Sequence, residues 1–171
     1  MQRVMIVGGP GSGKSTLARQ LGEKTGLPVY HMDRIHWQPG WIERETDEKA
    51  RLTREVHARQ RWIFEGGFSD TYRDRAARAD TLIWLDIAMW RRMVRVIRRM
   101  IVNRGKSRPD MPDGCPERLD REFLEFLRFI CRTRRSGPAR IRNVVEAGFT
   151  HLRVHRLTSL RDVRQFLASL D

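Results

Sequence analysis

Residues 8–15 read Gly8-Gly9-Pro10-Gly11-Ser12-Gly13-Lys14-Ser15, and this stretch decides the fold. It fits the pattern G-x-x-x-x-G-K-[ST], whose glycines let backbone N–H groups turn inward around an anion. Residues 3–7 are apolar and predict a buried strand before it, and residues 16–23 predict an amphipathic helix after it. A strand, a glycine loop and a helix in this order predict a phosphate-binding loop for a nucleoside triphosphate.

The residues of this loop have distinct expected roles. Lys14 is expected to reach the outer phosphates of ATP, and the Ser15 hydroxyl is expected to ligate Mg²⁺. The positive N-terminal end of the following helix would attract the same phosphates. The nucleotide-binding residues that the motif predicts are Gly8, Gly9, Pro10, Gly11, Ser12, Gly13, Lys14, Ser15 and Thr16.

The length of 171 residues suits one α/β domain that spans residues 1–171. No apolar run approaches the length of a membrane span, and the first expected strand leaves no room for a signal peptide. Cys115 and Cys131 lack the spacing of a metal site. We therefore expect free thiols in a reducing cytoplasm.

The formal net charge is +13, and nearly all of the basic residues are arginines. The planar guanidinium of arginine suits bidentate recognition of phosphate. A general compositional bias toward arginine would produce the same excess. The positions of the arginines along the chain must therefore separate the two interpretations.

Acidic residues end two of the expected strands. The second strand ends at Asp33, and the third ends at Glu65, which Gly66 and Gly67 follow. Carboxylates at such strand ends face the ligand crevice of an open α/β sheet. Asp33 is expected to orient an acceptor hydroxyl or to hold a metal-bound water, or else to cap the next helix. Glu65 is expected to lie beside Mg²⁺ or to position the acceptor, and the glycine pair would let a substrate approach the backbone.

The segment between these two strand ends, residues 33–60, is expected on the substrate side of the site. Its turn Trp37-Gln38-Pro39-Gly40-Trp41 puts two indoles in an irregular, charged stretch. The indoles indicate a lid over a substrate or a stacking platform for a base, and packing onto the domain is an equal alternative. Residues 47–60 predict a solvated amphipathic helix with His57 on its surface.

Residues 88–104 predict a helix with two different faces. Its apolar stripe consists of Met89, Met93, Ile97, Met100 and Ile101. Its arginine-rich face consists of Arg91, Arg92, Arg95, Arg98 and Arg99. Like charges one turn apart repel each other, so this face favours a bound anion, with a solvated arginine face as the alternative.

The glycine- and proline-rich residues 104–117 predict a mobile lid, in which Arg104, Lys106 and Arg108 come down on a phosphate. A helix that restarts near Leu119 carries Arg128 and Arg132 one turn apart. Residues 136–138 are expected to break that helix. The remaining expected strands and helices cover residues 81–86, 139–147, 152–157 and 160–170.

Four stretches carry a resemblance to known proteins: GGPGSGKST, HMDRIHWQPGW, WIFEGGFS and RPDMPDGCPERLDREFL. Nearly the whole chain resembles the nucleoside-monophosphate kinase and shikimate kinase group, and more narrowly the adenylate-kinase-related proteins labelled DNA topology modulation proteins. Many ATPases and GTPases share the first stretch, whereas the other three are far more specific to this subgroup. The resemblance implies a P-loop NTPase fold, with a five-stranded parallel sheet in the order 2-3-1-4-5 and helices on both faces.

The resemblance also implies roles for single residues. Asp33 matches the acidic residue that ends the second strand in these kinases. Glu65 falls where adenylate kinases carry a shorter carboxylate that is tied to magnesium through water. Arg95 and Arg99 match an arginine pair that leads into the lid, one near the adenine and one on the phosphates. Arg128 and Arg132 are further candidates, for the catalytic arginines that follow the lid.

The chain also departs from that group. Where adenylate kinases have Asp-Gly-Phe-Pro-Arg, this chain has residues 65–69, Glu-Gly-Gly-Phe-Ser, so an arginine that contacts AMP is missing there. Arg34 or Arg73 is a candidate to replace it, and Trp37 is a candidate acceptor contact. The lid has Cys115 as its only cysteine, which excludes a zinc-binding lid.

The leading hypothesis is a magnesium-dependent kinase that transfers the γ-phosphoryl group of ATP to a nucleotide or another small-molecule acceptor. The alternative is a nucleic-acid-binding ATPase or regulator of DNA topology, which the basic charge supports weakly because no helix-turn-helix or zinc-finger pattern is present. A third possibility is a P-loop protein that binds nucleotide without turning it over. The acidic strand ends argue against that third possibility.

Overall fold

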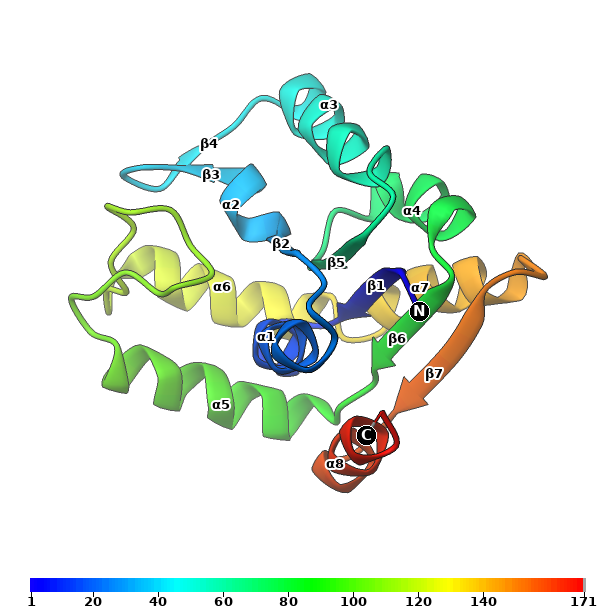
Figure 1. Cartoon of the computed structure of the whole chain (residues 1–171). Helices are drawn as coiled ribbons and strands as arrows, with labels where there is room; N and C mark the ends of the chain where they lie inside the picture. The colour runs from blue at the N-terminus through cyan, green and yellow to red at the C-terminus, as the bar shows by residue number, and fades with distance from the viewer. Residues whose placement is uncertain (171) are drawn as a thin grey trace.

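A computed structural model describes residues 1–170, in which strands and helices alternate along most of the chain (Figure 1). The strands are β1 (Arg3–Gly8), β2 (Val29–His31), β3 (Trp37–Gln38), β4 (Ile42–Glu43), β5 (Trp62–Glu65), β6 (Thr81–Leu85) and β7 (Arg153–Leu157). The helices are α1 (Lys14–Thr25), α2 (Met32–His36), α3 (Thr46–His57), η1 (Ser69–Thr71), α4 (Tyr72–Arg78), α5 (Met89–Val102), α6 (Arg121–Arg132), α7 (Ser136–Glu146) and α8 (Leu160–Ala168).

Five parallel strands form the main sheet, in the order β2-β5-β1-β6-β7. When only these strands are counted along the chain, the order is 2-3-1-4-5, as the sequence predicted. The strands β3 and β4 instead pair with each other as a separate antiparallel hairpin. The turn with two indoles is therefore a hairpin that stands outside the main sheet.

Alternation along the central strand divides the core between the two faces of the sheet. Val4 and Ile6 of β1 pack with α1 and α8 on one face. Met5 and Val7 pack with α3, α4 and α7 on the other face. Figure 1 shows α3 and α4 above the sheet and α8 below it, so helices cover both faces as predicted.

The helices α5 and α6 lie side by side and form a separate small core of Val96, Met100, Phe123 and Ile130 (Figure 1). This differs from the predicted stripe, because Ile97 and Ile101 of α5 are exposed. The packing partner, which the sequence of α5 does not reveal, decides which side of the helix is buried.

Two further expectations are wrong. Residues 136–138 do not break a helix but form the first turn of α7. Proline fits there because backbone N–H groups in the first turn of a helix have no intrahelical acceptor, so the missing N–H costs no hydrogen bond. His57 is not on the surface: it is 2% exposed and packs against the rings of Trp62 and Phe64. Its helix is otherwise amphipathic, so the histidine occupies a position that faces the core.

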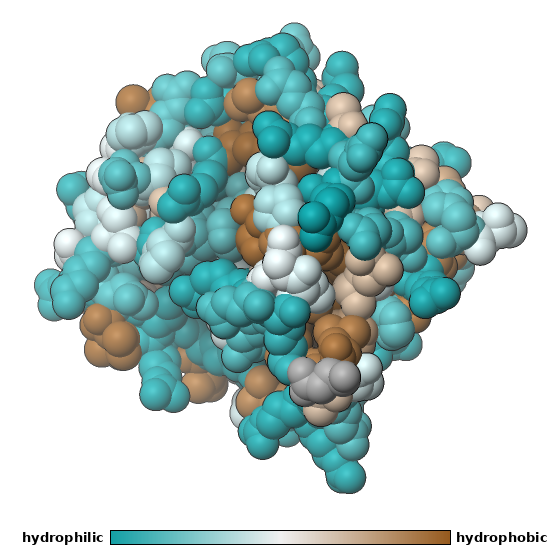
Figure 2. All heavy atoms as spheres, viewed as in Figure 1, coloured by the Kyte–Doolittle hydropathy of each residue, from teal (hydrophilic) through white to brown (hydrophobic). Residues whose placement is uncertain are grey.

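The surface is mostly hydrophilic. Figure 2 shows hydrophobic residues only in scattered groups on the face it displays. Within residues 1–170, no helix is long and apolar enough to cross a membrane. Cys115 and Cys131 are both free, the first buried and the second exposed.

Candidate active site

The glycine loop has a backbone conformation and a close packing that residues with a Cβ atom cannot adopt. Gly11 has φ +75°, and a Cβ there would lie 2.4 Å from the carbonyl oxygen of Arg92. A Cβ on Gly9 would lie 1.8 Å from Nη1 of Arg92. The loop is therefore pressed against α5, with its backbone open on the other side. This is the cradle that a phosphate-binding loop needs.

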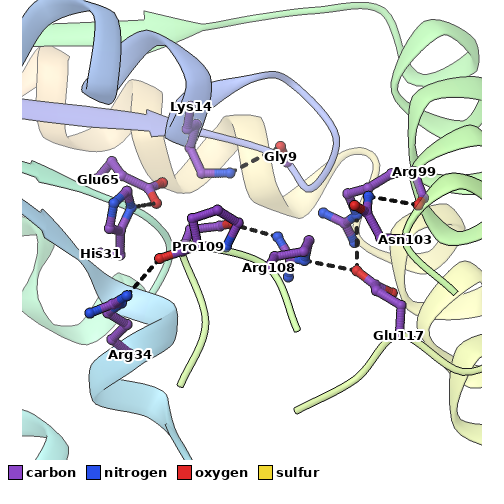
Figure 3. Close-up of polar contacts among 11 residues, drawn as sticks. Gly9, Lys14, His31, Arg34, Glu65, Arg99, Asn103, Arg108, Pro109 and Glu117 are labelled. Atoms are coloured by element: carbon purple, nitrogen blue, oxygen red, sulfur yellow. Dashed lines mark hydrogen bonds and ion pairs between the residues drawn. The ribbon is translucent and has the colours of Figure 1, made fainter. Parts of the chain in front are cut away.

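The helix α1 begins at the end of this loop, and no side chain caps its N-terminus. Its first backbone N–H groups therefore remain available to an anion. Lys14 Nζ donates to the carbonyl oxygen of Gly9 at 3.3 Å, so the side chain folds back over the loop (Figure 3). Arg95 of α5 donates through Nη1 to the carbonyl oxygen of Ser12 at 3.0 Å. The loop thus has three positive side chains beside it, those of Lys14, Arg92 and Arg95.

Carboxylates lie at the end of β5 and just after the end of β2. Glu65 is the last residue of β5, and its Oε1 lies 2.7 Å from Nδ1 of His31, the last residue of β2 (Figure 3). Asp33 does not end β2 as predicted, and it does not cap the next helix, because His31 occupies the N-cap of α2. It lies in the first turn of α2 instead. The short strand stops two residues earlier because the chain turns directly into this helix.

The electrostatic surroundings of Asp33 are unusual. Burial, and then the neighbouring carboxylate of Glu65, raise the pKa of Asp33 above its ordinary value. The positive charges of Lys14 and Arg108 act in the opposite direction. A carboxylate held near like charge in a cleft is a candidate for proton transfer or for a cation-binding role.

The predicted lid, residues 104–117, crosses over this edge of the sheet. Its base is held by backbone hydrogen bonds from Gly105 to Glu117 at 2.9 Å and from Glu117 to Lys106 at 3.1 Å. Arg108 contacts Asp110 at 2.6 Å and Glu117 at 2.8 Å, and Arg99 of α5 contacts Glu117 at 3.2 Å. An arginine of the lid thus lies beside an arginine of α5.

The lid is docked onto the substrate-side segment, residues 33–60. The N–H of Gly40 donates to the carbonyl oxygen of Gly114 at 3.0 Å, and Trp41 Nε1 donates to that of Pro116 at 3.1 Å. Arg34 Nη2 donates to the carbonyl oxygen of Pro109 at 2.7 Å (Figure 3). The β3–β4 hairpin is therefore the surface on which the lid packs.

A cavity of about 1140 Å³ lies under the lid and joins these parts. Its phosphate end is lined by the glycine loop, Lys14, Ser15, Thr16, Arg95, Arg99 and Arg108, together with Asp33 and Glu65. Its other end is lined by Trp37, Trp41, Gly67, Phe68, Tyr72 and Arg140. The volume is large enough for a nucleotide and a second small molecule.

The structure does not bring every predicted residue into this cavity. Arg73 is exposed on α4, and Arg34 is engaged by the lid backbone. Arg128 and Arg132 are exposed on α6 and line a separate groove with Met93 and other residues. The placement of Arg128 and Arg132 gives no support to a catalytic role, because neither residue lines the cavity.

The glycine pair after Glu65 has two different roles. Gly66 supports the chain rather than the cavity: a Cβ there would lie 2.5 Å from that of Met32, and its φ is +119°. The buried Arg75 holds the same turn by donating to the carbonyl oxygen of Gly66 at 3.1 Å. Gly67 lines the cavity, as expected of a residue that a substrate approaches.

Several cavity residues were missed by the sequence reasoning. The lid acids Asp110 and Glu117 and Arg140 of α7 line the cavity, together with the buried Arg92 of the predicted arginine-rich face. The sequence carried no signal for Arg140, which is one arginine among many. The lid motif contains Asp110 and Glu117, but their buried positions depend on arginines of α5 and of the lid itself.

The donor atoms fit a magnesium ion that is held mainly by a nucleotide. Ser15 offers its hydroxyl, and the carboxylates of Asp33 and Glu65 line the same cavity, where the charge of Glu65 raises the pKa of Asp33. No group of three or more histidine, cysteine or acidic residues in residues 1–170 would hold a metal without other ligands. Magnesium commonly binds one or two protein groups, waters and substrate phosphates, which matches this set.

The chain matches no family model and no curated protein sequence. Among solved structures it is similar to shikimate kinase from Acinetobacter baumannii in complex with shikimate, with a TM-score of 0.58, 17% identity and coverage of 99% and 91% of the two chains. Shikimate kinase from Bacteroides thetaiotaomicron gives a TM-score of 0.58, 17% identity and coverage of 99% and 96%. Deoxyadenosine kinase from M. mycoides gives a TM-score of 0.53 and 11% identity, with coverage of 98% of this chain and 97% of the kinase chain.

These similarities show the fold: an α/β P-loop fold of the kind found in shikimate and deoxynucleoside kinases. The broader resemblance to the nucleoside-monophosphate and shikimate kinase group is thereby confirmed at the level of fold. The narrower resemblance, to DNA topology modulation proteins, is not confirmed by them and stays a prediction.

Proposed function

We propose that the protein is a magnesium-dependent kinase that moves the γ-phosphoryl group of ATP to a nucleotide or another small acceptor. One observation carries this proposal: the glycine loop with Lys14 and the carboxylate of Asp33 line the same cavity, beneath a lid whose Arg108 also lines it. Phosphoryl transfer asks a protein mainly to position the reactants and to balance phosphate charge. The side chains at the two sides of this cavity are suited to those two tasks.

At the phosphate end, the loop N–H groups and Lys14 would bind and orient the ATP phosphates. Arg95 and Arg99 would balance the charge on the transferring group. Ser15 would hold Mg²⁺ directly, and Asp33 and Glu65 would hold it through water. The ion would supply positive charge that offsets the charge of the phosphates. The lid would exclude water and so suppress loss of the phosphoryl group by hydrolysis.

At the other end, Asp33 would orient the attacking group of the acceptor and take a proton from it if that group is a hydroxyl. Trp37, Phe68 and Tyr72 offer an aromatic wall for the body of the acceptor. Arg140, whose Nη1 donates to Ser69 Oγ at 3.2 Å, is the arginine at this end of the cavity. It replaces Arg34 and Arg73 as our candidate for a contact with an acidic acceptor.

A screen of nucleoside monophosphates, nucleosides and small hydroxylated metabolites with Mg-ATP tests the proposal. We expect transfer to at least one acceptor, and loss of most ATP affinity or turnover in Lys14→Ala. Lys24→Ala, at the exposed last turn of the same helix, is the matched control and should behave like the parent. If Lys14→Ala binds and turns over ATP normally, the proposal is wrong. Binding without transfer to any acceptor would favour a nucleotide-binding protein without kinase activity.

A nucleic-acid-binding ATPase or regulator of DNA topology remains the second candidate, and one observation favours it. Arg128, Arg132 and Arg134 are exposed together along a groove between α5 and α6, away from the cavity. An exposed cluster of arginines is free to contact phosphates of a duplex. Replacing Arg128 and Arg132 with alanine should leave phosphoryl transfer unchanged. It should lower duplex affinity only if this second function exists.

A further inference from the structure

Glu117 joins two arginines that come from different elements. Its Oε1 lies 2.8 Å from Nε of Arg108, in the lid, and 3.2 Å from Nε of Arg99, on α5 (Figure 3). The carboxylate is buried, with only 5% of the residue exposed. Both arginines line the phosphate end of the cavity. One buried oxygen therefore holds the two guanidinium groups side by side.

Two adjacent guanidinium groups need a nearby negative charge to stay together. Their positive charges repel, and burial weakens the screening that water would provide. Burial, and then the charge of Arg108, lower the pKa of Arg99, which reflects this repulsion, while the Glu117 carboxylate acts in the opposite direction. Without Glu117 the pair would separate, and Arg108 of the lid would be left with Asp110 as its acidic partner.

Glu117 is itself fixed in place by its backbone. Its N–H and its carbonyl oxygen both take part in the hydrogen bonds that close the base of the lid. Asp110, the other acidic partner of Arg108, lies in the middle of the lid rather than at its base. Glu117 therefore has the fixed position that an orienting group needs.

The contacts with Glu117 leave the arginines able to act on another anion. Arg99 Nε, Arg108 Nε and Glu117 Oε1 are close, but none of the three forms an aligned hydrogen bond. Electrostatic attraction therefore holds the cluster together more than directional hydrogen bonds do. The outer guanidinium nitrogens can turn toward a phosphate without breaking an aligned bond to Glu117.

We propose that Glu117 is a positioning residue, which holds Arg108 of the lid next to Arg99 so that both guanidinium groups meet the terminal phosphate of a bound triphosphate. This inference rests on the proposed function, because it assumes that a nucleoside triphosphate occupies the cavity. It keeps Arg108 as the expected phosphate contact of the lid and adds Glu117 as the group that aligns the pair. Glu117 itself touches no substrate.

The test compares Glu117→Gln with Glu117→Asp and with Glu125→Gln. Glutamine removes the charge at nearly constant size, and aspartate keeps the charge on a shorter side chain. Glu125 is exposed on α6, where it pairs with Arg121 at 3.1 Å, so Glu125→Gln controls for the loss of an acidic residue. Dissociation constants for ADP and for a non-hydrolysable ATP analogue give a readout that needs no acceptor.

For Glu117→Gln we expect an unchanged dissociation constant for ADP and a preference for the triphosphate analogue that falls by about 10-fold. Turnover should fall by roughly 10- to 100-fold, the loss that misplaced groups in a site produce. Glu117→Asp should recover part of both losses, and Glu125→Gln should match the parent. A merely structural role would weaken ADP and triphosphate binding together and would not be rescued by aspartate.

Three results would overturn the inference. Tighter triphosphate binding in Glu117→Gln would mean that the carboxylate competes with phosphate for the arginines. An unchanged preference for triphosphate over ADP would mean that Glu117 aligns nothing. If the unmodified protein binds neither nucleotide, the proposed function fails and this inference fails with it, whereas the first two results leave the proposed function standing.

Discussion

The imidazole Nδ1 of His31 lies 2.7 Å from Oε1 of Glu65, and the two residues are register partners at the ends of the adjacent strands β2 and β5. Both side chains are nearly buried, so the contact holds the carboxylate in one orientation. It engages one of the two carboxylate oxygens. We infer that the other carboxylate oxygen of Glu65 can accept a hydrogen bond from a water bound to magnesium, in an orientation that His31 fixes.

Replacing Glu65 with glutamine should therefore raise the Mg²⁺ concentration needed for half-maximal activity. The charge is lost, and the outer contacts of a metal site affect its affinity by roughly 10- to 100-fold. A magnesium titration of the initial rate measures this change. An unchanged magnesium dependence would make Glu65 a substrate contact or a structural residue.

Asp33→Asn should have opposite effects on activity and on stability. The pKa of Asp33 is raised in the folded state, so the ionised carboxylate is less favourable there than in the unfolded chain. At neutral pH the parent carries this penalty and the variant does not, so the variant should melt at a higher temperature. Transfer to the acceptor should fall by about 10²-fold or more, because a positioned proton acceptor is lost.

The pH dependence of that stability gain checks its cause. Below the unfolded pKa of Asp33 the carboxyl is protonated in both states, so parent and variant should melt alike. The difference should grow as the pH rises from the unfolded pKa to the folded pKa and should then persist to neutral pH. Equal melting temperatures at every pH would show that Asp33 carries no electrostatic penalty. Equal turnover would remove it from the catalytic site.

A comparison of Arg95 with Arg98, which lies about one turn further along α5, distinguishes an arginine of the phosphate site from an arginine of the surface. Arg95 contacts the carbonyl oxygen of Ser12 and lines the cavity, whereas Arg98 is exposed. Arg95→Ala should weaken ATP binding by roughly 10-fold or more, since charge-assisted hydrogen bonds contribute about 1.5–3 kcal/mol. Arg98→Ala should change it less than about twofold.

Salt dependence then distinguishes the two candidate functions. If Arg95 and Arg99 serve an enclosed triphosphate, their double alanine variant should lose ATP-dependent activity at every salt concentration, because screening is weak there. If they serve nucleic acid, ATP turnover should persist. The log–log slope of nucleic-acid affinity against salt should then fall by about one unit for each lost phosphate contact.

His57 should make the protein less stable as the pH falls. Burial, and then the charges of Arg75 and Arg78, lower the pKa of His57 from 6.5 to about 3. The unfolded chain therefore binds a proton below pH 6.5 that the folded protein does not accept. This costs about 1.4 kcal/mol of unfolding free energy for each pH unit between those two values. Denaturant unfolding at several pH values measures the slope.

The variant His57→Phe should flatten that slope. Neither ring nitrogen of His57 has a hydrogen-bond partner among the described residues, so phenylalanine removes two unsatisfied buried polar atoms. At pH 7 we expect stability that is unchanged or higher. A slope that is as steep in the variant as in the parent would assign the acid sensitivity to other groups.

The sequence by itself determined the sheet and the phosphate loop, because both follow from local pattern. The spacing of glycines between residues 8 and 13 demands a backbone that other residues cannot adopt, and Lys14 and Ser15 follow at a fixed distance along the chain. Short apolar segments marked the strands, and the resemblance that the sequence motifs carry implied their parallel order. These signals need no knowledge of distant residues.

The tertiary structure alone decided which charged residues meet. Nearly every helix carries arginines, so composition could not tell that Arg95 reaches Ser12 while Arg128 and Arg132 face solvent. The burial of Glu117 depends on where the lid crosses α5, and the choice of the buried side of α5 depends on α6. Such contacts join residues far apart in the chain. They are set by how whole elements pack, which no local pattern encodes.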